Sequence, residues 1–187
     1  MNKTCTMTTP LLSAFSLTMI LFYCSSVAYS QVTSWEITED YTIEFSGTKA
    51  EGTFRGLSGI ILFDPDDLDA SKFDVELEVN TISTGNKTKD KHARGESWFY
   101  AEKFPKIHFT SNKITSLQVG YEAVGDMEIR GVKKEVILAF SFFDEGKQGM
   151  FEGELKVNRE DYGIEGNLFE FVVGDEFAVT IQLTADK

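Results

Sequence analysis

The sequence predicts an all-β protein, an antiparallel barrel of about eight strands. Apolar and polar residues alternate along Phe73 to Val79, which is the period of a half-buried strand. The second half of the chain repeats this alternation in segments separated by turns near Gly120, Gly131 and Gly174. Several segments keep one apolar face over about ten residues, and closing such long strands into a barrel removes edges that invite aggregation. A sandwich is the alternative that these observations disfavour.

The expected strands follow one another along the chain with short turns between them. Gly56 and Gly59 interrupt the second strand, where glycines indicate a bulge or a sharp bend as the sheet curls. The turn after it, Asp64 to Asp67, combines a proline with aspartates that bond local backbone. The eight expected strands cover residues 35–45, 53–63, 73–79, 107–112, 121–130, 136–142, 151–158 and 177–183.

The charged segment between the third and fourth strands predicts a short helix. Asn86 or Thr88 is placed to cap its first turn, and the helix would run through Arg94 and end at Gly95. Pro105 then returns the chain to extended structure. Both histidines of the chain lie in or beside this region, so polar chemistry is sought here first.

Residues 1–30 are expected to be a signal peptide and residues 31–187 the mature domain. Lys3 precedes a mostly apolar run over residues 11–23, and Ala28 to Ser30 forms a small-x-small cleavage site before Gln31. This predicts a periplasmic or secreted protein. A retained anchor is one alternative, and a lipoprotein modified at Cys24 is another, although the bulky Tyr23 argues against it.

Composition excludes several classes of function for the mature chain. Both cysteines, Cys5 and Cys24, lie in the leader, so disulfides, thiolate metal sites and cysteine nucleophiles are excluded together. The net charge of −12 becomes −13 without Lys3, and such a field repels phosphate backbones. Nucleic acid is therefore not expected as a partner.

Sixteen phenylalanines either fill a packed core or line an elongated apolar cavity. The small inward residues Gly125 and Gly153, on strands that otherwise carry large ones, favour some open space. The residues expected to line such a cavity are Phe45, Phe54, Val75, Leu77, Val79, Phe109, Met127, Leu138, Phe140, Phe151 and Leu155.

Polar candidates are fewer. Four residues of the helical segment, His92, Arg94, Trp98 and Phe99, are expected at the cavity mouth, where the first two would bond an anionic or polar headgroup. His108 is expected to face outside, and two histidines do not make a metal site. The run from Asn158 to Gly163 indicates a turn stabilised by an arginine–carboxylate contact rather than an acid/base pair. We expect no catalytic residue, metal or cofactor.

A series of short motifs resembles one known family. The chain is similar to the YceI-like, lipocalin-like domain from about residue 35 to residue 183. The motifs that carry the resemblance are Gly52-x-Phe54 with Gly59, Phe63-Asp64-Pro65, Thr84-Gly85-Asn86, Asp90-x-His92-x-Arg94, Phe99, Lys103 to Ile107 with Phe109 and Ser111, Gly125-Asp126 with Ile129 to Val132, and Asn158-Arg159-x-Asp161-Tyr162-Gly163.

The resemblance implies an extended barrel with a helical segment near its mouth and a long apolar tunnel that binds polyisoprenoid or other amphiphilic chains. It brings no catalytic set. The chain departs from the family pattern at Ala93, where a larger apolar residue is common, at Gly95-Glu96, which replaces the usual serine region, and at Glu135, where proline is frequent. The Ala93 change puts the headgroup preference in doubt.

The function expected from these observations is that of an exported, non-enzymatic binding protein. Its ligand would be a polyisoprenoid, an isoprenoid quinone or a fatty-chain lipid, held for carriage, storage or a stress response. A stress-protective or interaction module with a packed interior is one alternative. A lipid-modifying enzyme that uses His92 is another. A second copy of the chain is a further candidate partner, which would make the protein a homodimer.

Overall fold

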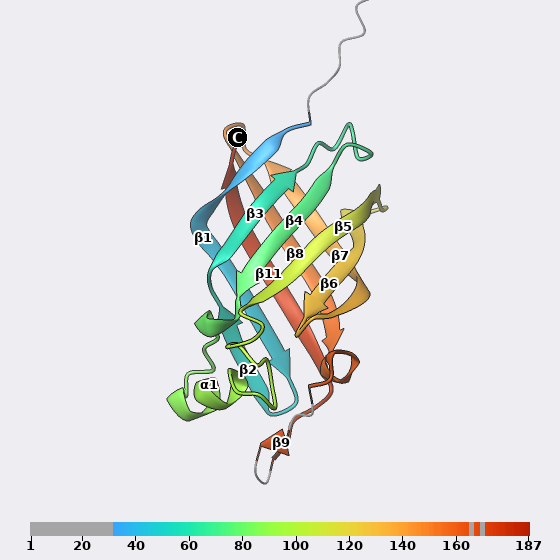
Figure 1. The fold of residues 1–187 in the computed structure, drawn as a ribbon. Coiled ribbons are helices and arrows are strands. Elements are labelled where there is room, and N and C mark those ends of the chain that lie inside the picture. Colours follow the sequence, from blue (N-terminus) through green and yellow to red (C-terminus); the bar gives the residue numbers. More distant parts are fainter. Residues whose placement is uncertain (1–31, 165–166, 169–170) are drawn as a thin grey trace, which may run out of the picture.

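A computed structural model describes residues 32–164, 167–168 and 171–187. The expected signal peptide and its cleavage site lie outside these residues. The strands close into an elongated barrel, with the one α-helix of the described residues at its lower end in Figure 1. The strands are β1 (Ser34–Gly47), β2 (Ala50–Phe54), β3 (Leu57–Leu62), β4 (Lys72–Glu78), β5 (Lys106–Ser116), β6 (Tyr121–Ile129), β7 (Val132–Asp144), β8 (Gln148–Asn158), β9 (Asn167–Leu168), β10 (Phe171–Val172) and β11 (Glu176–Asp186).

The barrel is an antiparallel meander that closes on β1. Each strand from β3 to β8 pairs with the next, β11 follows β8, and β11 also pairs with β1. Because β2 and β3 pair with different parts of β1, they share one position in the wall. The predicted eight-stranded antiparallel barrel is therefore confirmed. The two short strands β9 and β10 pair only with each other.

The segment expected as one strand over residues 53–63 is two strands, separated at Arg55 and Gly56. Gly56 has a φ of +74°, a left-handed conformation that ends the pairing of β2 with β1. β3 then rejoins β1 only at the far end of the barrel, at Trp35 and Ile61 and the residues beside them. Between these stretches the Tyr41 hydroxyl accepts hydrogen bonds from the Gly56 and Leu57 amides at 2.7 and 3.0 Å.

Aromatic rings, packed mostly edge to face, fill the end of the barrel away from α1. Phe63 is fully buried at the centre of this group, and its ring centroid lies 5.0 to 6.1 Å from those of five other rings. Edge-to-face contacts at such distances are favourable beyond the burial of apolar area. We call this group the ring cluster; it comprises Trp35, Phe63, Phe73, Tyr121, Phe140, Phe142 and Phe151.

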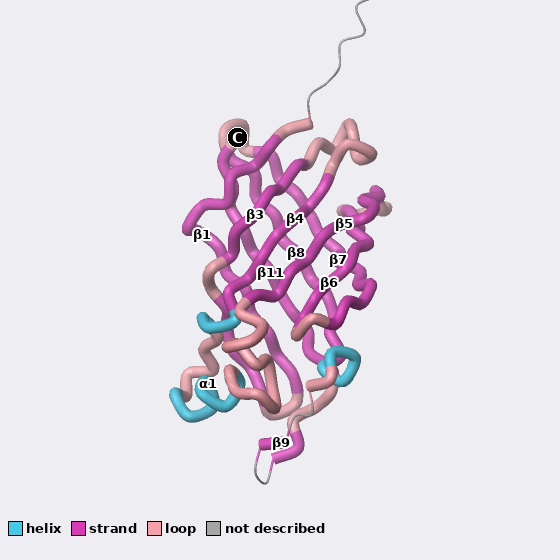
Figure 2. The backbone as a smooth tube through the Cα atoms, in the orientation of Figure 1, coloured by secondary structure: helices cyan, strands magenta, loops and turns pink. Residues whose placement is uncertain are grey.

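The opposite end carries the helices, which Figure 2 shows in cyan around the lower part of the barrel. They are η1 (Val79–Thr81), α1 (Lys87–Ala93) and η2 (Arg159–Tyr162). As expected, the Asn86 side chain caps α1 by accepting from the amides of its first turn. The Asp90 carboxylate accepts from the amide and the hydroxyl of Thr84, each at 2.7 Å. These bonds hold the pKa of Asp90 below its usual value and fix the helix to the preceding chain.

Over the described residues, no helix has the length and apolar character that crossing a membrane requires.

Candidate functional site

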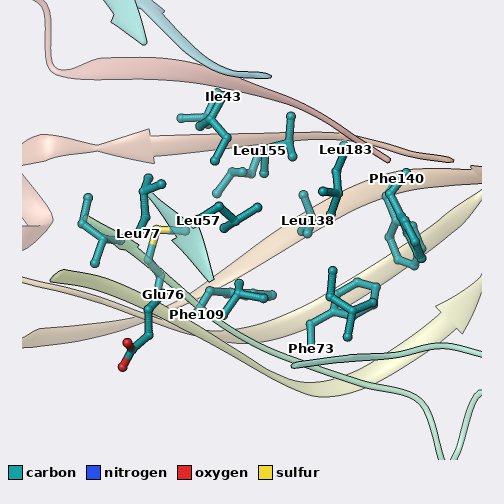
Figure 3. Close-up of a pocket in the computed structure, with 18 residues that line it drawn as sticks. Ile43, Leu57, Phe73, Glu76, Leu77, Phe109, Leu138, Phe140, Leu155 and Leu183 are labelled. Carbon is teal, nitrogen blue, oxygen red and sulfur yellow. The ribbon is translucent and has the colours of Figure 1, made fainter. Parts of the chain in front are cut away.

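An apolar cavity of about 130 Å³ lies inside the barrel between the ring cluster and the α1 end. Every strand of the barrel wall except β2 contributes side chains to it (Figure 3). Glu76 is the exception to its apolar character, and its carboxylate points away from the other side chains in the close-up. The lining residues are Ile43, Leu57, Ile61, Phe73, Val75, Glu76, Leu77, Ile107, Phe109, Met127, Leu138, Phe140, Phe151, Gly153, Leu155, Val179, Ile181 and Leu183.

Strand register explains why these residues meet. Val75 lies opposite Phe109, which lies opposite Met127, so one inward row crosses β4, β5 and β6. On the far wall Phe140 lies opposite Gly153, and Gly153 lies opposite Ile181. Because side chains of paired residues emerge on the same face, the alternation in sequence becomes a continuous apolar wall.

Gly153 leaves open space in that wall, as expected, whereas Gly125 does not. A Cβ built on Gly153 would come within 3.0 Å only of the flexible Leu138 Cδ1, and its other neighbours lie at 3.7 Å. A Cβ built on Gly125 would lie 2.4 Å from the Thr110 carbonyl oxygen. The expectation of space at Gly125 was wrong, because the neighbouring strand backbone fills it.

Eight of the eleven residues expected on the cavity wall line the cavity: Val75, Leu77, Phe109, Met127, Leu138, Phe140, Phe151 and Leu155.

The other three pack elsewhere. Val79 was expected on a strand, but β4 ends at Glu78 and Val79 begins η1. Phe45 and Phe54 contact each other, with ring centroids 5.4 Å apart, at the α1 end of the barrel. They are part of the packing below the cavity rather than of its wall.

None of the four residues expected at the mouth is among those lining the cavity. His92 is exposed on α1, and Arg94 donates from Nη1 to the Asn80 carbonyl oxygen at 3.1 Å. Phe99 packs its ring against Phe54, with centroids 5.7 Å apart, and Trp98 is buried. Their roles in headgroup binding stay predictions.

Several lining residues were not predicted as site residues, including Ile43, Phe73, Ile107 and Ile181. Each lies two residues from an inward-facing residue on its own strand, or opposite one on the adjacent strand. The alternation of inward and outward positions along a strand would therefore have found them. Leu57 and Ile61 were hidden because their strand was expected to run continuously from residue 53.

Polar groups on the outer face form ordinary surface pairs. His108 faces outside, as expected, and its Nε2 lies 2.7 Å from Asp74 Oδ1. This hydrogen bond, with smaller help from Lys72, holds the pKa of Asp74 below its usual 3.8.

Arg159 makes an arginine–carboxylate contact, as predicted, but its close partner is Asp175, outside the run from Asn158 to Gly163 in which the contact was expected. Arg159 is 7% exposed, and its guanidinium pairs with the Asp175 carboxylate. It also donates to the carbonyl oxygens of Gly174 at 3.2 Å and Ile164 at 2.5 Å. Arg159 therefore fixes both ends of the segment that joins η2 to β11.

Residues 28–185 match the YceI-like domain. The chain belongs to this family. It is 30% identical to a UPF0312 protein of Photorhabdus laumondii and 32% identical to one of Azotobacter vinelandii. Each match covers 63% of this chain, and 64% and 65% of those relatives, which is less than two thirds of their length.

Several solved structures share the fold. BcnA of Burkholderia cenocepacia superposes with a TM-score of 0.75 at 21% identity, over 80% of this chain and 99% of BcnA. A YceI protein of Campylobacter jejuni gives 0.64 at 21% identity, over 96% and 99%. A polyisoprenoid binding domain from Saccharophagus degradans, implicated in plant cell wall breakdown, gives 0.61 at 14% identity, over 83% and 99%.

Proposed function

We propose that this YceI-like chain is an exported, non-enzymatic binding protein that holds the apolar chain of a polyisoprenoid or similar amphiphilic lipid inside its barrel. The observation that carries the proposal is the apolar cavity inside the barrel, whose wall comes from strands all around the barrel. Membership of the YceI-like family and the shared fold of a polyisoprenoid binding domain support it.

The size of the cavity indicates how a chain would be accommodated. A cavity of about 150 Å³ lined by aliphatic and aromatic side chains binds benzene in another protein, so 130 Å³ suits one ring-sized segment of a ligand. Each buried methylene contributes roughly 0.8 kcal/mol before the costs of binding. A longer chain therefore has to displace side chains of the ring cluster or of the α1 end, and its own burial offsets that cost.

The direct test is mass spectrometry of the protein after expression of the full chain in a bacterium. We expect organic extracts to contain a lipid in stoichiometric amount, and the intact mass to show removal of residues 1–30. If the protein yields no stoichiometric lipid and takes up none when offered prenyl or fatty chains, the alternative of a stress-protective or interaction module with a packed interior would replace this proposal.

A matched pair of variants tests whether the cavity is the binding site. Gly153→Val adds three carbons inside the cavity, where a Cβ meets only a movable leucine terminus. Ala139→Ile also adds three carbons, but Ala139 is exposed on the outer face of β7. We expect lipid retention to fall at least several-fold in Gly153→Val and to be unchanged in Ala139→Ile. Equal retention in two folded variants would place the ligand elsewhere.

A further inference from the structure

We propose that Trp98 and Tyr162 form a two-donor site that binds an uncharged carbonyl oxygen at the head of the ligand. The inference rests on the proposed function, because the apolar part of such a ligand would occupy the cavity. It assigns a ligand chemistry to the α1 end, where the exposed His92 and the paired Arg94 had been expected to act.

The first observation is that both donors are buried without a partner. Trp98 is 7% exposed and Tyr162 is 2% exposed, yet the indole Nε1 and the phenol oxygen have no hydrogen-bond partner within the described part of the chain. The indole of Trp35, by contrast, donates to the Phe63 carbonyl oxygen at 2.9 Å. A buried donor left unpaired costs about 1–3 kcal/mol, so two of them together indicate a ligand group that satisfies them.

The second observation is that one side chain holds their two segments together. Arg130 Nη1 donates to the Trp98 carbonyl oxygen at 2.6 Å and to the Gly163 carbonyl oxygen at 3.1 Å. Gly163 directly follows Tyr162 in the chain. Trp98 and Tyr162 also belong to one buried apolar cluster, with Ile129, Ile164 and Val173.

The third observation is that this cluster adjoins the cavity. Ile107 and Met127 line the cavity and also pack against the cluster that contains Trp98 and Tyr162. The cluster that contains the two donors therefore lies beside the wall of the cavity. A ligand with its chain in the cavity and an oxygen at its lower end would reach both donors when Met127, a flexible side chain, moves aside.

The charges around the site favour a neutral head over an anion. Indole and phenol are both neutral donors, and burial, with the nearby Asp161 carboxylate adding to it, raises the pKa of Tyr162 to about 12. The charge of Arg159, which bonds the Ile164 carbonyl oxygen, is paired with Asp175, and the Arg130 guanidinium donates to the backbone carbonyl oxygens of Trp98 and Gly163. Since the net charge of the chain is also strongly negative, an apolar chain ending in a carbonyl fits better than one ending in a phosphate or carboxylate.

The experiment compares three probes of one length: 2-undecanone, undecane and undecanoate. The chain has two tryptophans, so an amide–indole NMR spectrum contains two indole signals, and Trp98→Phe identifies them. We expect 2-undecanone to shift the Trp98 indole proton downfield and to leave that of Trp35 in place, whereas undecane produces no downfield shift. Tyr162→Phe should weaken ketone binding about threefold to tenfold, the value of one hydrogen bond, and leave undecane binding unchanged. Tyr100→Phe, on the segment that carries Trp98, is the matched control.

The outcomes separate this site from the cavity itself. If undecane and 2-undecanone bind equally and Tyr162→Phe affects neither, the donors take no part, an ordered water satisfies them, and the cavity proposal stands. If undecanoate binds more tightly than the ketone, the head is an anion and this inference is overturned. If none of the probes binds, the proposed function fails first and this inference with it.

Discussion

Replacing Phe63 with alanine tests how much of the barrel's stability comes from the ring cluster. Phe63 is fully buried, and its ring touches those of Phe73, Phe140 and Phe151, among others. Phe→Ala substitutions in cores cost about 3–5 kcal/mol. Aromatic pairs add about 0.5–1.5 kcal/mol each beyond burial, so we expect a loss near the top of that range, about 4–5 kcal/mol.

The free energy of unfolding would be measured by urea denaturation and the melting temperature by circular dichroism. For a domain of this size, each kcal/mol lowers the melting temperature by about 2–4 °C, so a fall of about 8–20 °C is expected. Phe143→Ala is the control on β7, because Phe143 is 51% exposed and should lose less than about 1 kcal/mol. Phe63→Leu, a milder change, keeps the measurement open if the alanine variant does not fold.

The same substitution should also lengthen the cavity. Phe73, Phe140 and Phe151 line the cavity and contact Phe63, so removing the Phe63 ring opens space continuous with it. We expect the folded variant to gain affinity for longer chains relative to short ones. Equal losses of stability in Phe63→Ala and Phe143→Ala, with no change in chain-length preference, would refute the reasoning.

Two further substitutions test polar contacts. Arg159→Met should lower the free energy of unfolding, measured by urea denaturation, by about 2–4 kcal/mol, because it leaves buried carbonyl oxygens unpaired. Arg159→Lys should be destabilised as well, since one ammonium cannot replace the planar guanidinium. Full stability in Arg159→Lys would contradict this. Asp74→Asn should cost less than about 1 kcal/mol at pH 7, because the side chains of Asp74 and His108 are 38% and 37% exposed. Since folding lowers the pKa of Asp74, its contribution is present above the usual value of 3.8 and is lost as the pH falls through the folded pKa. The urea midpoints of the two proteins should therefore converge on acidification, and a difference that grows below pH 4 would exclude this contact as its source.

Local patterns predicted the parts of the fold that depend on neighbours in the chain. The alternation of apolar residues gave the strands and their inward faces, and a single capping residue, Asn86, located α1. Local patterns failed where the environment of a residue depends on a segment that is distant in the sequence. Gly125 and Gly153 have the same inward parity, but only the backbone at Thr110 distinguishes the filled position from the open one.

The candidate site divides in the same way. Eight cavity residues followed from strand parity, because the barrel converts parity into a common interior. That Trp98 and Tyr162 share one buried cluster did not, because Arg130 joins two loops that are far apart in the sequence. The sequence also could not show whether the interior is hollow or packed. The structure shows a barrel that is packed at the ring cluster and has a cavity between this cluster and the α1 end.

The division of one wall position between β2 and β3 makes the barrel unevenly resistant to opening. β8 and β11 are joined along eleven paired residues. The stretch of β1 near Tyr41 is joined to residues 55–57 by three hydrogen bonds, two to the Tyr41 hydroxyl and one from Arg55 Nη1 to the Tyr41 carbonyl oxygen. Each of those hydrogen bonds contributes on the order of 1 kcal/mol, so this join separates at far lower cost than any full ladder. Fluctuations that loosen the wall without unfolding the domain should therefore concentrate at the join between β1 and the start of β3. The barrel would open there first, while its other strand pairs stay closed.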